Sequence, residues 1–298
     1  MPSDGVNRDS GGNMMTQWIR FDCFALVACL ALSAGNAATA QEMRVYTTIR
    51  DISGQSSAAN SDQGPVVVRS LMLFHAGKVY DYIEPAREVT VYEPAHRRFT
   101  ILNSRRQLCT ELTHDEIRYF LGLAEDEAQK RMAFVPEESS ASSRKALEFL
   151  RFQFQPDFET SFDPAKPQLK LTADHFEYVV EGFQPEKHEL VEKYLQVADW
   201  MAQFNSVLHP QSLFPAPRLK LNQELRSHSL LPLTISLKAE TDPVLHLQAR
   251  HEWTWKFQKT DRQQIDNWDK QLRDTNFRKL PFREFQKEML RAEIAKKQ

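Results

Sequence analysis

The chain has 298 residues, and its 38 basic residues nearly balance its 40 acidic ones, for a formal net charge of −2. This balance excludes nucleic-acid binding driven by the charge of the whole chain. With 3 cysteines the protein is not a disulfide-stapled scaffold, and its length allows a sizeable core without such staples.

The N-terminal residues have the layout of a secretory signal peptide. An apolar run over residues 21–34 follows Arg20, and small residues (Ala-Thr-Ala) occupy positions 38–40. A positive residue, a short apolar segment and an A-x-A step are typical of such a signal, and the run is too short to cross a membrane as a helix. We therefore predict a signal peptide over residues 1–40, export to a periplasm, and no transmembrane span in the mature chain.

A second processing route would keep the protein at a membrane. Residues 26–29 (Leu-Val-Ala-Cys) resemble a lipoprotein processing site, which would leave a lipid anchor on Cys29. Cleavage after residue 40 would instead leave Cys109 as the only thiol, so that no internal disulfide could form. An exported chain without disulfides fits a bacterial periplasm.

The mature chain begins with strand signals. Apolar and polar residues alternate from Met43 to Arg50, and a Gly/Ser/Ala/Asn-rich stretch over residues 53–64 predicts a loop. Between residues 66 and 103, β-branched and aromatic runs are separated by turn signals at intervals of about ten residues, as in an antiparallel meander.

Helical periodicity follows the meander. Thr113 and Glu116 predict a capping box at the start of one helix, and a shorter helix is expected over residues 137–151. Alternation returns over residues 152–183. The clearest helix covers residues 190–208, and its apolar stripe needs a sheet to pack against.

The last third of the chain repeats the order of strands and then helices. Alternation over residues 233–239, a turn at 241–243 and seven apolar or aromatic odd positions over 245–257 predict a long hairpin with one apolar and one polar face. Asp261 is expected to cap a following helix, and Pro281 to begin another. These elements predict an α+β fold, in which several helices cover a curved antiparallel sheet, an incomplete barrel, within a single domain over residues 41–298.

No catalytic, cofactor or metal-binding motif is present in the sequence. The 9 histidines include no pair at the i, i+4 spacing of a helical metal site, and no G-x-S-x-G elbow occurs. Cys109 lies near Arg105 and Arg106, which could activate its thiol, but its pattern equally fits a buried strand position. We expect no metal and no cofactor, and we expect a non-enzymatic protein; an active site assembled from distant strands is the remaining alternative.

Aromatic residues are the strongest candidates for a binding site. They could interlock as a solid core, each burying a large apolar area, or line a cavity for an apolar ligand. The residues predicted to bind such a ligand are Trp253, Trp255, Phe257, Tyr80, Tyr82 and Phe99.

The stretch from Val66 to Leu102, with LMLFHAGKVYDYI, EVTVYEP and RRFTIL, resembles the periplasmic lipoprotein-carrier (LolA/LolB-like) superfamily. The resemblance implies an incomplete antiparallel barrel around helices that act as a lid, with acyl chains bound between them. The chain departs from this pattern in its length and in the helices expected over residues 137–151 and 281–297. It is also similar to exported proteins of bacteria with elaborate envelopes, which implies a location but no activity.

Two functions from different classes follow. The first is a carrier that shields a lipid or the acyl group of an acylated protein in the cell envelope. The second is an envelope structural or interaction module with a solid core and no small-molecule ligand. In that module a partner protein would meet the mixed-charge terminal helix or the polar side chains of Arg250, Glu252, Thr254 and Lys256.

Overall fold

The computed structural model describes residues 42–54, 64–84, 86–133, 140–209, 212–241 and 243–297, without the side chains of residues 292–297. The predicted signal peptide, with Cys29, and most of the predicted loop at 53–64 lie outside these residues. Residues 42–298 form one compact unit.

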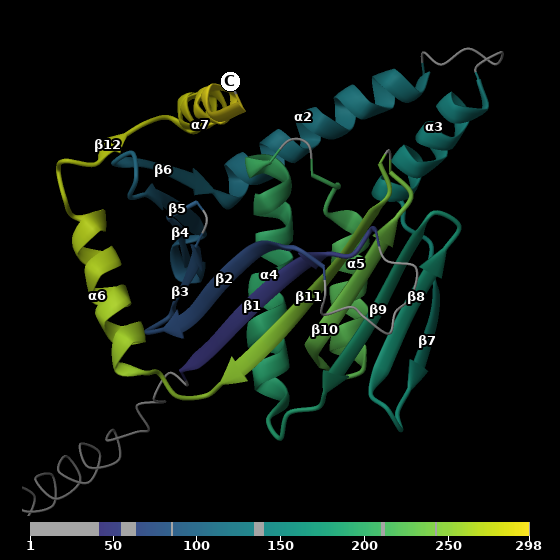
Figure 1. The fold of residues 1–298 in the computed structure, drawn as a ribbon, viewed down its shortest axis with the longest axis horizontal. Coiled ribbons are helices and arrows are strands. Elements are labelled where there is room, and N and C mark those ends of the chain that lie inside the picture. Colours follow the sequence, from purple (N-terminus) through teal and green to yellow (C-terminus); the bar gives the residue numbers. More distant parts are fainter. Residues whose placement is uncertain are drawn as a thin grey trace, which may run out of the picture. The chain divides into compact units, whose positions relative to one another are not determined.

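Twelve strands of the described residues form one sheet (Figure 1). They are β1 (Met43–Asp51), β2 (Val66–His75), β3 (Lys78–Ile83), β4 (Glu88–Glu93), β5 (Arg98–Asn103), β6 (Leu108–Thr113), β7 (Glu159–Asp163), β8 (Gln168–Ala173), β9 (Phe176–Phe183), β10 (Leu231–Ala239), β11 (Leu245–Thr254) and β12 (Arg278–Lys279). Their order is β12-β6-β5-β4-β3-β2-β1-β11-β10-β9-β8-β7. Neighbours are antiparallel except β12 and β6. The sheet is curved and does not close, because β12 and β7 are its two free edges.

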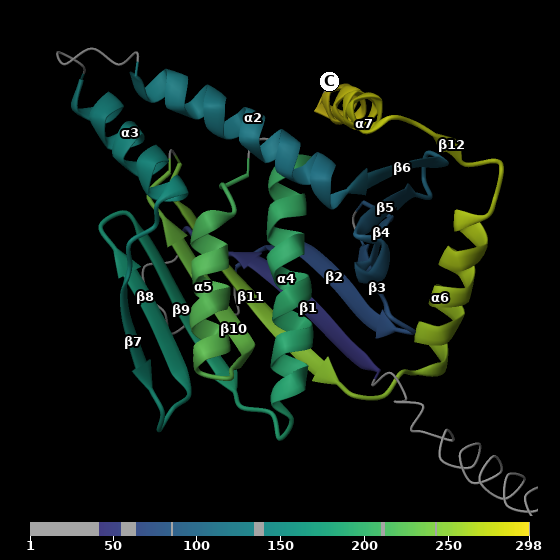
Figure 2. The ribbon, with the colours of Figure 1, turned by 180° about the vertical axis from the view of Figure 1, so that it is seen from behind.

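The helices are α2 (His114–Ala133), α3 (Ala141–Phe154), α4 (His188–Leu208), α5 (Ala216–Ser227), α6 (Lys259–Leu272) and α7 (Phe282–Lys297), with a short 3-10 turn, η2 (Pro94–His96). In Figure 2, α4 and α5 lie in front of the strands, and in Figure 1 they lie behind them. The predicted α+β class, a curved antiparallel sheet covered by several helices, is therefore confirmed.

The two faces of the sheet are buried by different helices. One face, here called the α4 face, carries Val45, Val79 and Tyr92 and belongs to the large core that includes residues of α2, α3, α4, α5 and α7. The opposite face, here called the α6 face, carries Leu73 and Tyr80 and packs against Ile265 and Trp268 of α6. Strands β2 to β6 are thus covered on both sides.

The C-terminal segment, residues 255–297, passes from one face of the sheet to the other. Trp268 of α6 stacks on Tyr80 with ring centroids 5.9 Å apart on the α6 face. Beyond α6, the Leu280 N–H donates to the Cys109 carbonyl at 2.9 Å, which places β12 along the free edge of β6. Helix α7 then packs on the α4 face, where Phe285 is fully buried. This segment therefore wraps around the β6 edge.

The predicted hairpin is confirmed where β10 and β11 pair, for example Ile235 with Ala249. Its regular alternation ends earlier than predicted, because β11 stops at Thr254. Trp255 still contacts the core of the α4 face, whereas Phe257 packs with the cluster of the α6 face. The prediction of one apolar face that continues through Phe257 is therefore wrong. After Trp255 the chain turns toward α6, which carries Phe257 to the α6 face of the sheet.

The predicted N-terminal cap is present at α2, whereas the cap of α6 differs from the prediction. At α2, the Glu116 carboxylate accepts the Thr113 N–H at 2.8 Å, and the Thr113 hydroxyl accepts the Glu116 N–H at 3.2 Å, which confirms the capping box. At α6 the helix begins at Lys259, so Asp261 is not the cap. Its carboxylate accepts the Gln258 N–H at 2.7 Å from within the first turn.

Candidate functional site

The six aromatic residues predicted to bind a ligand do not lie together. Phe99, Trp253 and Trp255 belong to the core of the α4 face. Tyr80, Tyr82 and Phe257 belong to the cluster of the α6 face. Because the sheet separates these two groups, they cannot line one cavity.

Phe99 and Trp253 each pack against an aromatic residue of α4. Phe99 is completely buried and stacks on Phe204 of α4 with centroids 4.5 Å apart. The Trp253 indole N–H donates to the Pro232 carbonyl at 2.8 Å, and its ring meets Tyr194 of α4 edge-on at 4.9 Å. These side chains fasten helices to the sheet.

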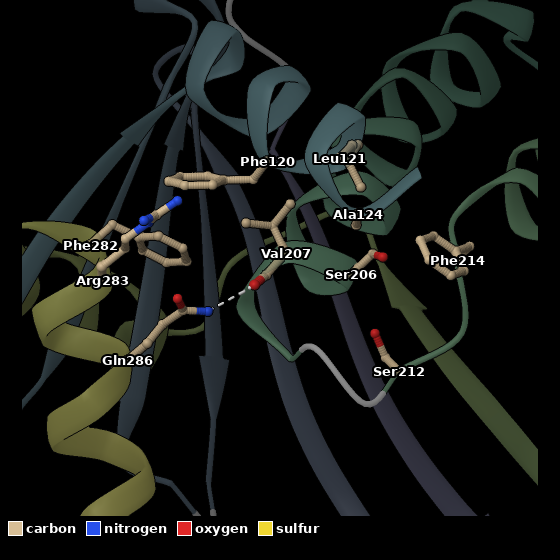
Figure 3. A pocket seen from close by; sticks show the side chains of 10 residues that line it. All are labelled: Phe120, Leu121, Ala124, Ser206, Val207, Ser212, Phe214, Phe282, Arg283 and Gln286. Atoms are coloured by element: carbon tan, nitrogen blue, oxygen red, sulfur yellow. Dashed lines mark hydrogen bonds between the residues drawn. The ribbon is translucent and has the colours of Figure 1, made fainter. Parts of the chain in front are cut away.

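A partly open cleft lies between α2, α4 and α7 (Figure 3). Its volume is about 210 Å³ and its walls are mainly apolar, formed by Phe120 and Leu121 of α2, Val207 of α4, Phe282 of α7, and Phe214. The sequence pattern does not reveal this cleft. The spacing of Phe120 and Leu121 showed an apolar helix face, but only the docking of α7 shows that part of this face stays open.

Polar groups at the cleft hold α7 in place and leave a cation beside the apolar wall. The Gln286 amide donates to the carbonyls of Val207 at 2.9 Å and Leu208 at 3.3 Å, where α4 ends. The Arg283 guanidinium carbon lies 5.4 Å from the centroid of the Phe120 ring. An apolar chain with an anionic end would match this combination of apolar wall and guanidinium.

A buried acid pair lies on the α4 face of β3 and β4. Asp81 is 8% exposed and Glu88 is 5% exposed. The buried Oδ1 of Asp81 has no hydrogen-bond partner among the described residues, and Glu88 accepts one long contact, 3.5 Å, from the Asn103 amide. Burial, and secondarily the charge of Glu88, raises the pKa of Asp81 to about 7. Burial also raises the pKa of Glu88.

His251 is another buried ionisable group of this face. Its Nδ1 lies 2.9 Å from the Thr47 hydroxyl, and its Nε2 has no partner among the described residues. Burial, reinforced by Arg218, lowers the pKa of His251 to about 3. The imidazole is therefore neutral near pH 7, and its single side-chain bond fits a structural role.

The remaining polar groups suggested by the sequence have structural surroundings. Burial raises the pKa of the Cys109 thiol, which disfavours the reactive thiolate. No three His, Cys, Asp or Glu side chains of the described residues group closely enough to hold a metal ion.

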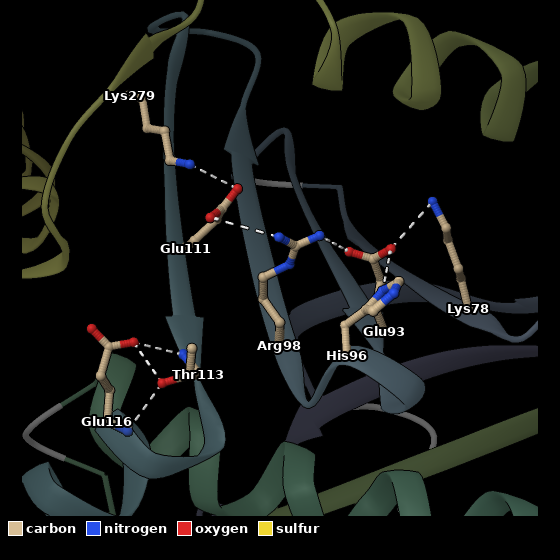
Figure 4. Close-up of polar contacts among 8 residues, drawn as sticks. All are labelled: Lys78, Glu93, His96, Arg98, Glu111, Thr113, Glu116 and Lys279. Carbon is tan, nitrogen blue, oxygen red and sulfur yellow. Dashed lines mark hydrogen bonds and ion pairs between the residues drawn. The ribbon is translucent and has the colours of Figure 1, made fainter.

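An ion-pair network crosses β4, β5 and β6 and reaches β12 (Figure 4). Arg98 lies 2.6 Å from Glu93 and 3.9 Å from Glu111, and Lys279 lies 2.9 Å from Glu111. The network links the C-terminal segment to the sheet edge. Because its charges are paired, the network is better explained as a structural link between the strands than as a set of catalytic residues.

No protein-family model matches the chain, and no curated protein matches it in sequence. None of the described helices combines the length and apolar character needed to cross a bilayer. The class of protein rests on the fold and the cleft: an α+β protein with an open antiparallel sheet, helices on both faces, and a small apolar cleft between three helices.

Proposed function

We propose that the protein is an exported, non-enzymatic binding or carrier protein for an apolar ligand, such as the acyl chain of a lipid or of a lipoprotein. The apolar cleft between α2, α4 and α7 carries this proposal. An open antiparallel sheet covered by helices also supports the resemblance to the periplasmic lipoprotein-carrier superfamily.

The volume of the cleft limits the size of the ligand that it can hold. Pockets for whole small molecules usually enclose about 300 to 1,000 Å³, and this cleft encloses about 210 Å³. It would therefore hold part of one acyl chain. Each buried methylene contributes about 0.8 kcal/mol before the costs of association, and Arg283 would meet a carboxylate or phosphate at the end of the chain.

The cell envelope is the proposed place of action. The apolar run over residues 21–34 and the small residues at 38–40 support export by a signal peptide. The motif ending at Cys29 supports the alternative of a lipid anchor. In either case a binding protein facing the envelope would have access to acylated molecules.

A bulky side chain in the cleft tests the proposal. Ala124 is exposed on α2 and lines the cleft, so Ala124→Phe would fill it without disturbing the buried core. We expect the wild type to bind a fluorescent fatty-acid probe, and the variant to bind it at least about tenfold more weakly, a loss of about 1.4 kcal/mol. Titration of probe fluorescence measures this difference.

A matched control is available on α3. Ala146 is also an exposed helical alanine, but it lies outside the cleft, so Ala146→Phe should leave probe binding unchanged. The proposal fails if the folded wild type binds no probe, or if Ala124→Phe binds it as well as the wild type does.

A specific observation also favours the interaction module. The α6 face of β1 and β11 has no labelled helix in front of it in Figure 1, and it carries a polar hollow of about 370 Å³ lined by Thr48, Arg50, Gln248, Arg250 and Glu252. Such a surface could meet a polar partner protein.

The module predicts a charge-sensitive partner. Reversing the charge with Glu252→Lys should abolish co-purification of a stoichiometric envelope partner by affinity chromatography, whereas Glu159→Lys on the distant edge strand β7 should not. Retention of the same partner by Glu252→Lys, or absence of any partner for the wild type, would count against this function.

A further inference from the structure

The register of the sheet brings Asp81 and Glu88 together on the α4 face. Asp81 pairs with Thr90 across β3 and β4, and Glu88 pairs with Asn103 across β4 and β5. Asp81 and Glu88 are therefore diagonal neighbours on one face of adjacent strands. Ionising both carboxyls of one buried patch carries a high free-energy cost, because each charge would be desolvated beside another negative charge.

The described residues supply no compensating charge in direct contact. No basic side chain among them pairs with Asp81 or Glu88, and the Oδ1 of Asp81 is buried without a partner. A second unpartnered group lies on the same face, where the hydroxyl of the fully buried Thr110 also lacks a partner. The patch is therefore compatible with a neutral acid and poorly compatible with two carboxylates.

Arg106 lies beside Asn103, the neighbour of Glu88, and its guanidinium is bound to α7. The Arg106 backbone N–H donates to the Asn103 side-chain oxygen at 3.2 Å. Its guanidinium donates to the Glu288 carbonyl of α7 at 2.6 Å. The Asn103 amide, which contacts Glu88, also lies 3.7 Å from the Met289 sulfur. Asn103 and Arg106 thus connect the acid pair to α7.

Other elements packed near Asp81 bring few competing charges. Helix α4 brings the buried phenol of Tyr194. Burial and the charge of Asp81 raise the pKa of Tyr194, whereas Arg218 of α5 lowers it. Strand β2 brings Met72, opposite Asp81. Lys193 of α4 lies over the Phe74 ring at 5.7 Å. On α7, the Glu288 carboxylate is paired with Arg291 at 3.4 Å.

We propose that Asp81, Glu88 and Arg106 form a proton-controlled latch for α7. With one proton on the acid pair, Arg106 holds the Glu288 carbonyl and α7 stays docked. Loss of that proton leaves two adjacent carboxylates, which draw Arg106 away from α7 and admit water to the patch. Helix α7 then loses the Arg106 and Met289 contacts and loosens from the sheet.

The latch is defined without any ligand and goes beyond the proposed function. Should the cleft bind an acyl chain, the same movement would open one of its walls, because Phe282 and Gln286 of α7 line it. Hydrogen exchange of the protein alone needs no ligand, so its outcome is independent of probe binding.

Amide hydrogen exchange of the full folded chain tests the latch. Protection factors, corrected for the intrinsic effect of pH, should fall about tenfold more in α7 than in β10 between about pH 5.5 and about pH 8.5, because β10 follows only the change in global stability. Asp81→Asn should keep α7 protected at both pH values. Arg106→Gln should leave α7 weakly protected at both. Asp163→Asn, an exposed control on β7, should behave as the wild type.

Two results would overturn the latch. One is equal protection of α7 at both pH values in the wild type. The other is a pH-dependent loss of α7 protection that persists in Asp81→Asn. Circular dichroism of each variant confirms that it is folded, and a loss of protection that is larger in α7 than in β10 distinguishes the latch from global unfolding.

Discussion

Asp81→Asn is expected to raise the free energy of unfolding by about 4 kcal/mol at about pH 8.5, since one unit of pKa shift corresponds to about 1.4 kcal/mol. Burial and the charge of Glu88 raise the pKa of Asp81 from 3.8 to about 7. The folded state therefore binds this proton more tightly than the unfolded chain does. Stability due to the protonated carboxyl is complete below about pH 4 and is lost as the pH rises through about 7. Asparagine keeps the shape and removes the charge.

Urea unfolding of both proteins between about pH 5 and about pH 8.5 measures this effect. The wild type should lose stability relative to Asp81→Asn as the pH rises, and the difference between the two proteins should shrink toward low pH. His251 acts in the opposite direction: its lowered pKa contributes stability above about pH 6.5 that is lost as the pH falls through about 3. A constant difference between the two proteins at every pH would show that Asp81 does not titrate in this range.

Phe204→Ala is expected to lower the free energy of unfolding by about 3 to 5 kcal/mol, because it removes a buried ring and leaves a cavity. Phe204 is 1% exposed and stacks on Phe99, which stacks in turn on Tyr92 with centroids 4.3 Å apart. This stack joins α4 to β5 and β4. Loss of the ring should therefore also reduce the exchange protection of α4.

Tyr119 provides the control for this truncation. It is 61% exposed on α2, and Tyr119→Ala should change the stability by no more than about 0.5 kcal/mol. Chemical denaturation followed by tryptophan fluorescence compares the two variants. A loss of less than about 1 kcal/mol in Phe204→Ala would mean that the stack does not fasten α4 as described.

Alternation and helical spacing predicted elements wherever only one face of a strand or helix is buried. The β10–β11 pair, the α4 stripe and the Thr113–Glu116 cap follow from local pattern, and the structure confirms them. The end of β11 could not be predicted, because Trp255 and Phe257 continue an apolar alternation after the strand has ended. Only tertiary packing shows that Phe257 serves the other face.

The acid pair was hidden by burial on both faces. In β3 the tyrosines at positions 80 and 82 mark an apolar face, so Asp81 between them looks like a solvent-facing residue in the sequence. Helix α6 covers those tyrosines, while the large core of the α4 face buries Asp81 as well. The cleft was hidden for a related reason, since its walls come from segments far apart in the chain. Neither periodicity nor spacing contains that information.

The passage of the C-terminal segment around the β6 edge sets an order of events during synthesis. Pairing of residues 278–279 with 108–109 closes a very long loop of chain, and contacts so distant in sequence form late in folding. Until α6 has left the ribosome, Leu71, Leu73 and Val91 have no cover on their side of the sheet. Nascent chains that lack this segment would expose an apolar surface to chaperones, although nearly all of their strands had already been synthesised.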